Sequence, residues 1–184
     1  MKKTIIATFA LIAATLASQA QVQLLTGPII NPENGHYYYM TTVASWTSAE
    51  SFAESLGCHL ATIRNAQEDS WVYNTFTGMD GAQNLWVGLN DLQHKGTYSW
   101  ADGEPITYLN WGPGEPDDSG GIEDCVRYFE PSSPKAGTWN DAPNNANCEG
   151  IIESLQPVPE PSVLALGALA AAVAGPAIRR RNLR

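Results

Sequence analysis

The sequence predicts one α+β domain in which two helices precede a series of short strands. Two stretches in the first half, 46–56 and 65–76, carry apolar residues at helical spacing. Beyond them, apolar residues occur in short runs between turn residues, which is typical of strands. The longest segments rich in Gly, Pro, Asn and Asp are 110–121 and 131–147. Structureless loops of such length in a compact domain are usually functional.

Both predicted helices have start signals of their own. In the first, Thr47 and Glu50 are spaced as a capping box, and Gly57 follows the last apolar residue as a stop. The second begins at Asn65, a residue type favoured at N-caps, with Glu68 three positions further on. One face of the second helix carries Trp71, Val72 and Phe76.

The strands are predicted from runs of β-branched, aromatic and aliphatic residues that turn residues bound on both sides. They lie at 37–42, 85–89, 97–100, 125–129 and 150–153. No internal repeat is present. About 130 residues lie between the two terminal segments described next, which is enough for one domain with a sizeable core.

The N-terminus has the parts of a secretory signal peptide in their usual order. Two lysines precede an apolar run at 5–16, and small residues follow at Ser18 and Ala20. We expect cleavage after Ala20, so residues 1–20 are assigned to the signal peptide and the mature protein to the outside of the cell or its surface. A buried first helix is the alternative.

The C-terminal segment, 156–184, also has three parts. Pro-Glu-Pro at 159–161 precedes an apolar stretch rich in Gly, Ala and Leu, and arginines follow at 179–181 and 184. It resembles the bacterial PEP-CTERM sorting tail, which implies a bacterial source and processing by an exosortase. The apolar stretch is close to the ~20 residues that span a membrane, and the arginines favour the cytoplasmic side. We expect a transient membrane anchor; a permanent anchor is the alternative.

Between these segments the chain is strongly acidic. Six of the ten basic residues lie in the two terminal segments, whereas all nineteen acidic residues lie between Gln21 and Glu160. Four basic residues against nineteen acidic ones give this part a net charge near −15. That charge argues against nucleic acid or an anionic membrane surface as partner, and a metal cation is its natural counter-charge.

Oxygen donors are concentrated in two loop regions with no basic residue beside them except Arg127. Calcium takes six to eight oxygen ligands, whereas zinc would require Cys or His, so these residues favour calcium. A solvated acidic loop is the alternative. The donors are Glu115, Asp117, Asp118, Glu123, Asp124, Asn140 and Asp141.

The order of these landmarks resembles that of the C-type lectin-like domain family. The likeness covers about 35–153, and we assign 28–155 to this domain. It implies the family's α+β fold: two helices flanking small, mostly antiparallel sheets, with a long calcium-binding loop. The matching motifs are Ser-Trp-Thr-Ser-Ala at 45–49, His-Leu-Ala-Thr-Ile at 59–63, Leu-Trp-Val-Gly-Leu at 85–89, Asn-Trp at 110–111, Gly-Glu-Pro-Asp at 114–117, Glu-Asp-Cys-Val at 123–126 and Trp-Asn-Asp at 139–141.

The resemblance implies one calcium ion that also binds sugar. It assigns both the metal and the carbohydrate to the side chains of Glu115, Asp117, Glu123, Asn140 and Asp141, with the main-chain oxygen of Asp141 as an added ligand. It also implies a cis peptide bond between Glu115 and Pro116. Two vicinal sugar hydroxyls would replace calcium-bound water and hydrogen-bond to the same side chains.

The resemblance also implies a possible second calcium site at Asp91, Asp118 and Asp124. Lys95 stands where the family often has an acidic ligand. An ammonium there would repel calcium or pair with Asp91 in its place. Trp139, beside the first site, is expected to anchor the core, with a platform for sugar as the alternative.

Three cysteines allow one internal disulfide. By resemblance Cys125 is one half of a loop-closing pair, and Cys148 lies four residues beyond the expected partner position. We expect a bridge between Cys125 and Cys148, with Cys58 free and buried; a bridge between Cys58 and Cys148 is the alternative. The family's other, long-range pair would fall on Ala53 and Ile152.

The residues and the resemblance together predict an exported protein that binds mannose-type or surface polysaccharide glycans with calcium and catalyses no reaction. The three histidines are scattered, and none has a plausible nucleophile beside it. A calcium-stabilised module for protein–protein or matrix interaction, without sugar binding, is the alternative.

Overall fold

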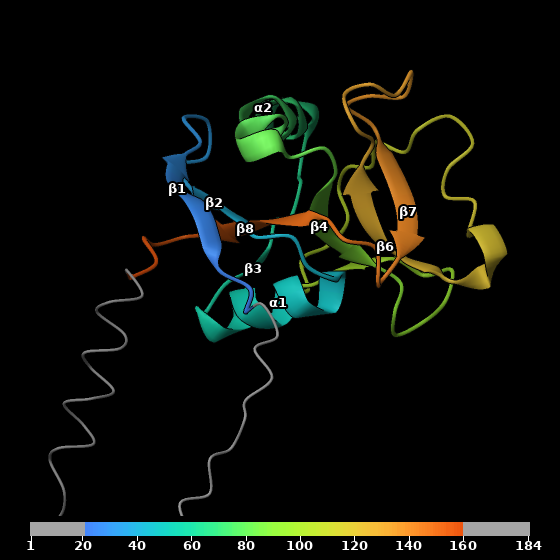
Figure 1. Ribbon diagram of the computed structural model, residues 1–184, viewed down its shortest axis with the longest axis horizontal. Helices are drawn as coiled ribbons and strands as arrows, with labels where there is room; N and C mark the ends of the chain where they lie inside the picture. Colours follow the sequence, from blue (N-terminus) through green and yellow to red (C-terminus); the bar gives the residue numbers. More distant parts are fainter. Residues whose placement is uncertain (1–20, 160–184) are drawn as a thin grey trace, which may run out of the picture.

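The computed structural model of the protein describes residues 21–159 (Figure 1). The predicted signal peptide, 1–20, and residues 160–184 of the predicted sorting tail lie outside this range. Among the described residues, no helix has the length and apolar character needed to cross a membrane.

The described part of the chain forms two α-helices and eight strands. Their bounds are β1 Leu24–Ile30, β2 Tyr37–Thr41, α1 Trp46–Ser55, β3 His59–Leu60, α2 Ala66–Phe76, β4 Leu85–Asn90, β5 Ser99–Trp100, β6 Glu123–Tyr128, β7 Trp139–Pro143 and β8 Glu149–Ser154.

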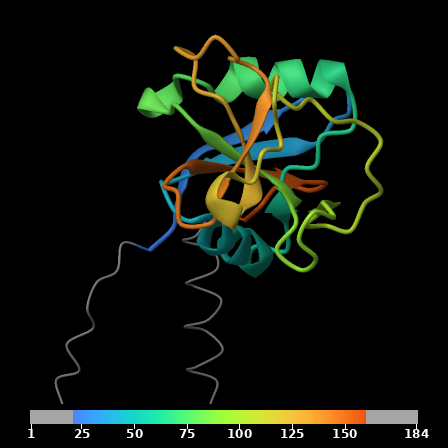
Figure 2. The same cartoon turned by 90° about the vertical axis from the view of Figure 1, so that its right-hand side faces the viewer.

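The strands form a mixed sheet with a helix on either side. They are hydrogen-bonded in the order β1-β2-β8-β4-β6-β7, with β3 also on β8 and β5 also on β4. β4 and β8 run parallel, and the other pairs of these strands are antiparallel. Figure 1 and Figure 2 show α1 and α2 on opposite sides of the sheet. The predicted α+β class, with two flanking helices and mostly antiparallel pairing, is confirmed.

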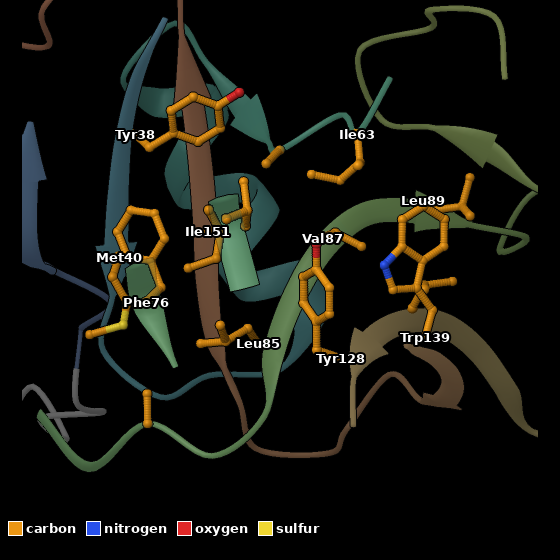
Figure 3. Packing of buried hydrophobic residues seen from close by; sticks show 14 of the residues in the cluster. Tyr38, Met40, Ile63, Phe76, Leu85, Val87, Leu89, Tyr128, Trp139 and Ile151 are labelled. Atoms are coloured by element: carbon orange, nitrogen blue, oxygen red, sulfur yellow. The ribbon is translucent and has the colours of Figure 1, made fainter. Parts of the chain in front are cut away.

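Side chains on the central strands alternate between two apolar clusters, because successive residues of a strand face opposite sides. On β4, Val87 belongs to the cluster beneath α2 together with Phe76, whereas Trp86 belongs to the cluster beneath α1 together with Ala53. The first cluster extends along the sheet to Trp139 on β7, as Figure 3 shows. One apolar layer therefore connects α2 to the strands that carry the loops.

Helix α1 lies where the sequence predicts it, but its N-terminus is capped differently. Ser45 is the N-cap, and the predicted capping box of Thr47 and Glu50 is not formed. The Glu50 carboxylate instead accepts a hydrogen bond from Leu60 N at 2.8 Å and contacts His59 Nδ1 at 2.6 Å. Glu50 therefore ties α1 to β3, a use that its spacing from Thr47 does not reveal.

The other predicted elements are found, and β1, β3 and β7 are additional to the predicted strands. Asn65 caps α2 as predicted. β7 falls within 131–147, which the sequence predicts to be a loop. The prediction missed this strand because its sequence, Trp-Asn-Asp-Ala-Pro, has the composition of a loop. Pairing with β6, from Tyr128 opposite Trp139 onwards, makes it a strand. β1 pairs only with β2 and has two register shifts along this pairing.

Gly88, in the Leu-Trp-Val-Gly-Leu motif, allows two segments to pack closely. A Cβ at this position would lie 2.5 Å from the main-chain oxygen of Leu60. The Gly88 N–H donates to the main-chain oxygen of Ala61 at 2.9 Å. The absence of a side chain at 88 thus lets the segment after β3 lie directly on β4.

The predicted disulfide between Cys125 and Cys148 is not formed: these two cysteines and Cys58 are free and buried. The backbone of Cys148 pairs with that of Ala44 through two hydrogen bonds of 2.9 and 3.2 Å. The position expected to hold the second cysteine is Asn144, which accepts hydrogen bonds from the first backbone N–H groups of α1. The shift by four residues therefore removes the cysteine from the loop-closing position. The free, buried Cys58 is as expected.

Apolar packing stands where the resemblance places the long-range disulfide. Ala53 on α1 and Ile152 on β8 are both fully buried in the cluster beneath α1. α1 is thus held to the central strand by apolar burial, worth roughly 25 cal/mol per Å² of apolar area.

The described chain begins and ends at one edge of the sheet. β1 is the outermost strand at this edge. The Val158 N–H donates to the hydroxyl of Tyr39 on β2 at 2.8 Å, and Val158 and Pro159 share a surface hollow with residues 24–28. β7 is the last strand at the opposite edge.

Candidate functional site

The segment that precedes the acidic loop is attached to the start of β7. Trp139 N donates to the Asn110 oxygen and Gly112 N donates to the Trp139 oxygen, each at 2.8 Å. A Cβ at Gly112 would lie 2.7 Å from the Phe129 ring and 2.9 Å from the Thr138 hydroxyl. Only glycine allows this close approach, which brings the Glu-Pro-Asp loop alongside β7.

A buried carboxylate, Asp69 on α2, holds the same region from beneath. It accepts hydrogen bonds from Tyr128 Oη at 2.6 Å, Trp139 Nε1 at 2.9 Å and Asn110 Nδ2 at 2.6 Å. Burial raises the pKa of Asp69, although these hydrogen bonds act to lower it. Trp139 is fully buried, so the expected core anchor is confirmed. Asp69 has no sequence signal beyond a charged residue within a helix.

Three of the five predicted calcium ligands lie together. Carboxylate oxygens of Glu115, Asp117 and Asp141 are all within 4.8 Å of one another. Asp141 is fully buried, and only 6% of the Glu115 side chain is exposed. The Glu115–Pro116 peptide bond is cis, as the resemblance implies. Three carboxylates this close repel one another unless a cation lies among them.

The other two predicted ligands border this group. Glu123, the first residue of β6, accepts a hydrogen bond from Ser119 N at 2.8 Å. Burial, and then the nearby charges of Asp141 and Asp117, raise the pKa of Glu123. The Asn140 amide donates to the main-chain oxygen of Asp141. Turning that amide over would direct its oxygen to the same place, so Asn140 can supply either a donor or a ligand.

Asp141 also fixes the conformation of the acidic loop. Its carboxylate accepts hydrogen bonds from Asp117 N at 3.1 Å and Asp118 N at 2.9 Å, and from Tyr98 Oη at 3.3 Å. These three hydrogen bonds tie the loop to β7 and to the segment before β5. Tyr98 is a contributor that sequence reasoning missed, because it directly precedes β5, far in the sequence from the ligand motifs.

The donor set of this group fits calcium. All of its side-chain donors are oxygens, as calcium prefers. Glu115 Oε1 is paired with Lys135 Nζ at 2.7 Å, but the buried Glu115 Oε2 has no hydrogen-bond partner among the described residues. A buried carboxylate oxygen without a partner is costly, and a cation among these carboxylates would compensate it.

Two lysines stand beside the acidic residues: Lys95, which the resemblance places at the second site, and Lys135, which the sequence did not indicate. Lys135 contacts Glu115, and its ammonium lies 4.9 Å from the centre of the Phe129 ring. Lys95 contacts the residues of the second predicted site. Arg127 lies beside Cys148 instead. The loop 131–138 folds back toward Glu115, and this contact is hard to predict because the two residues are far apart in the sequence. The one available signal for a role of Lys135 was the rarity of basic residues in this part of the chain.

The second predicted site is assembled around an ammonium group. Lys95 Nζ is 2.7 Å from Asp118 Oδ1, 3.0 Å from Asp124 Oδ1 and 3.8 Å from Asp91 Oδ2. A cavity of about 300 Å³ lies between this group and the first one, lined in part by Tyr98, Asp118 and Asp141. The expected pairing of Lys95 with Asp91 is thus extended to three carboxylates, and these residues do not fit a second calcium ion.

Comparison with known proteins agrees with this geometry. The family model for the lectin C-type domain matches residues 42–151. Perlucin from Haliotis laevigata is 38% identical over 117 residues, which are 61% of this chain and 74% of perlucin. C-type lectin domain family 4 member G from mouse is 33% identical over 119 residues, or 63% of this chain. The chain covers only 37% of the length of that mouse protein.

A solved structure has the same fold. The C-type carbohydrate-recognition domain of cow CD23, crystallised in the presence of GlcNAc2Man3 oligosaccharide, superposes with a TM-score of 0.58 at 29% identity. The match covers 66% of this chain and 89% of that domain.

The Lys135–Glu115 pair gives a direct test of the metal-free site. Lys135→Met leaves the nearly buried Glu115 without its charge partner, so we expect the free energy of unfolding in chelator to fall by about 1–3 kcal/mol. Lys135→Arg keeps the charge and should recover most of this loss. Denaturant unfolding in the wild-type and Glu115→Gln backgrounds measures the coupling. An equal loss in both backgrounds would show that the ion pair stabilises nothing.

Proposed function

The chain belongs to the C-type lectin domain family, and on this premise we propose that it binds carbohydrate through one calcium ion outside the cell. The observation that carries the proposal is the convergence of Glu115, Asp117 and Asp141, together with the buried Glu115 Oε2 that has no hydrogen-bond partner among the described residues. Members of this family are generally non-catalytic binding modules. The proposed ligands are Glu115, Asp117, Glu123, Asn140 and Asp141.

Bound calcium would supply open coordination positions for two vicinal sugar hydroxyls. The chain supplies what surrounds them. The carboxylates of Glu115, Asp117 and Glu123 can accept hydrogen bonds from the hydroxyls, and such bonds to ionised acceptors are the stronger kind. Asn140 can donate to a hydroxyl oxygen through its amide. Asp141, fully buried and bonded to the loop backbone, keeps these groups in place.

The sequence Glu-Pro-Asp at 115–117 bears on which sugar is bound. In the C-type lectin-like family that the sequence resembles, the triplet Glu-Pro-Asn is typical of mannose-type binding and Gln-Pro-Asp of galactose-type binding. Glu115 keeps the mannose-type identity, and the cow CD23 domain was crystallised with a mannose-containing oligosaccharide. Asp117 replaces an amide by an acceptor-only carboxylate. We therefore propose mannose-type or surface polysaccharide glycans as partners, bound with modest affinity.

We further propose that the protein is exported by its signal peptide and held briefly at the membrane by its tail. The apolar stretch and arginines after residue 160 support this proposal. By resemblance an exosortase would remove the tail, which would leave the domain at the cell surface or in the medium.

Calcium should raise the melting temperature of the mature domain, because the ion relieves the repulsion among the carboxylates. At a calcium concentration 100 times Kd the stabilisation is about 2.7 kcal/mol, which corresponds to roughly 5–10 °C for a domain of this size. Asp141→Ala and Glu123→Ala should abolish the shift, whereas Glu33→Ala, an exposed carboxylate elsewhere, should keep it. A melting curve that chelator leaves unchanged would contradict the calcium site.

A glycan array, run with calcium and again with chelator, tests sugar binding separately. We expect calcium-dependent signals on mannose-type glycans. A calcium-dependent melting shift without signal on any glycan would favour the alternative, a calcium-stabilised protein or matrix interaction module.

Asp117→Asn should strengthen mannose or fucose binding several-fold, because it restores the amide of the mannose-type triplet. Isothermal titration with the monosaccharides at saturating calcium measures the change, and Glu33→Gln serves as the charge-matched control. If the variant loses mannose and gains no other sugar, or if the wild type binds galactose alone, the assignment of Glu115 and Asp117 is wrong.

Deleting 160–184 should release the domain into the medium. The cut spares Val158, whose hydrogen bond to Tyr39 makes it part of the folded body. Mass spectrometry of the wild-type mature protein should show that the four C-terminal arginines are missing. An intact C-terminus in the membrane fraction would favour the permanent anchor.

A further inference from the structure

The ammonium of Lys95 lies among the oxygens that the second calcium site would have used. Its Nζ donates to Asp118 Oδ1 and to the main-chain oxygen of Glu123, each at 2.7 Å, and to Asp124 Oδ1 at 3.0 Å. An ammonium has three N–H donors, and these three contacts use all of them. Asp91 Oδ2 completes the surroundings at 3.8 Å.

We propose that Lys95 is a covalently tethered cation that replaces the second calcium ion. The domain then takes one calcium ion, and its acidic loop is ordered before that ion arrives. This inference rests on the proposed calcium site at Glu115, Asp117 and Asp141. It adds that the carboxylates of Asp91, Asp118 and Asp124 are neutralised by a side chain of the same protein, Lys95.

Electrostatics decides against two cations in this place. A divalent ion beside the Lys95 ammonium would be repelled by it twice as strongly as a second unit charge at the same distance. Displacing Lys95 into solvent would instead sacrifice three charge-assisted hydrogen bonds. Calcium also requires six to eight oxygens, of which Lys95 already engages three.

The same ammonium connects to the first site through Glu123 and Asp118. The Glu123 main-chain oxygen accepts from Lys95, while its carboxylate borders the first group beside Asp117 and Asp141. Asp118 accepts from Lys95 and from Glu123 N at 3.1 Å, and its own N–H donates to Asp141. Asp118 has a φ of 45°, a left-handed conformation that this set of contacts holds in place. Lys95 therefore acts as a positioning residue for the calcium ligands.

With Lys95 in place of a calcium ion, one carboxylate oxygen of this group has no hydrogen-bond partner among the described residues. Asp91 Oδ2 accepts from Gly96 N at 2.6 Å, but the buried Asp91 Oδ1 has no hydrogen-bond partner among the described residues. A cation with three directed donors satisfies fewer oxygens than calcium does. A carboxylate at 95 would remove the ammonium and add an oxygen ligand, which should restore the second site.

Equilibrium dialysis with radioactive calcium, on the mature wild-type domain, tests the count of ions. We expect one calcium ion per chain in the wild type and two in Lys95→Glu. In Lys95→Met we expect a lower melting temperature in chelator and calcium binding about ten-fold weaker. Lys95→Arg, which keeps the charge, should recover part of both losses, and Glu33→Gln should match the wild type.

Two ions in the wild type, or a Lys95→Met variant with unchanged melting in chelator and unchanged calcium affinity, would overturn the inference. Neither result would affect the proposed first site. A wild type that binds no calcium would instead contradict the proposed function, and the role of Lys95 would then depend on the melting of Lys95→Met in chelator alone. If Lys95→Glu does not fold, the Lys95→Met comparison decides.

Discussion

The buried carboxylate of Asp69 is the interaction on which the arrangement of the loops depends. It lies on α2 and accepts hydrogen bonds from β6, from β7 and from the segment before the acidic loop, through Tyr128, Trp139 and Asn110. Leaving a buried charge without its hydrogen bonds costs several kcal/mol, so Asp69 holds these elements in one arrangement. The apolar layer under α2 packs against the same strands, and the carboxylate adds hydrogen bonds that join them to the segment before the loop.

Local sequence signals predicted those parts of the fold that local physics determines. Helical spacing and the Asn65 cap located α2, and apolar runs bounded by turn residues located β2, β4 and β8. What failed depended on distant partners. Asn144 contributes to the N-terminus of α1 from almost a hundred residues away, and β7 becomes a strand only because β6 pairs with it.

In the candidate site, too, some features could be predicted from the sequence, whereas others depend on residues distant in the chain. The resemblance named its oxygen donors, and the structure places Glu115, Asp117 and Asp141 together. The cations around them were foreseen only in part: Lys95 was, because it replaces an expected acid, whereas Lys135 was not, because a loop returns it to Glu115. The two lysines also differ in kind. Lys95 completes three contacts, and Lys135 satisfies one oxygen of a carboxylate whose other oxygen has no partner.

The strand order gives the domain a direction. Residues 24 and 158 lie at the β1 edge, and β7, which carries Asn140 and Asp141, lies at the other. Whatever is joined to either end of the described chain, whether a tether, a surface or a fusion partner, is thus kept on the side remote from the acidic loop. A domain arranged in this way can be immobilised or arrayed in many copies through its ends, with the acidic loop of every copy directed outward and accessible from the surrounding solution.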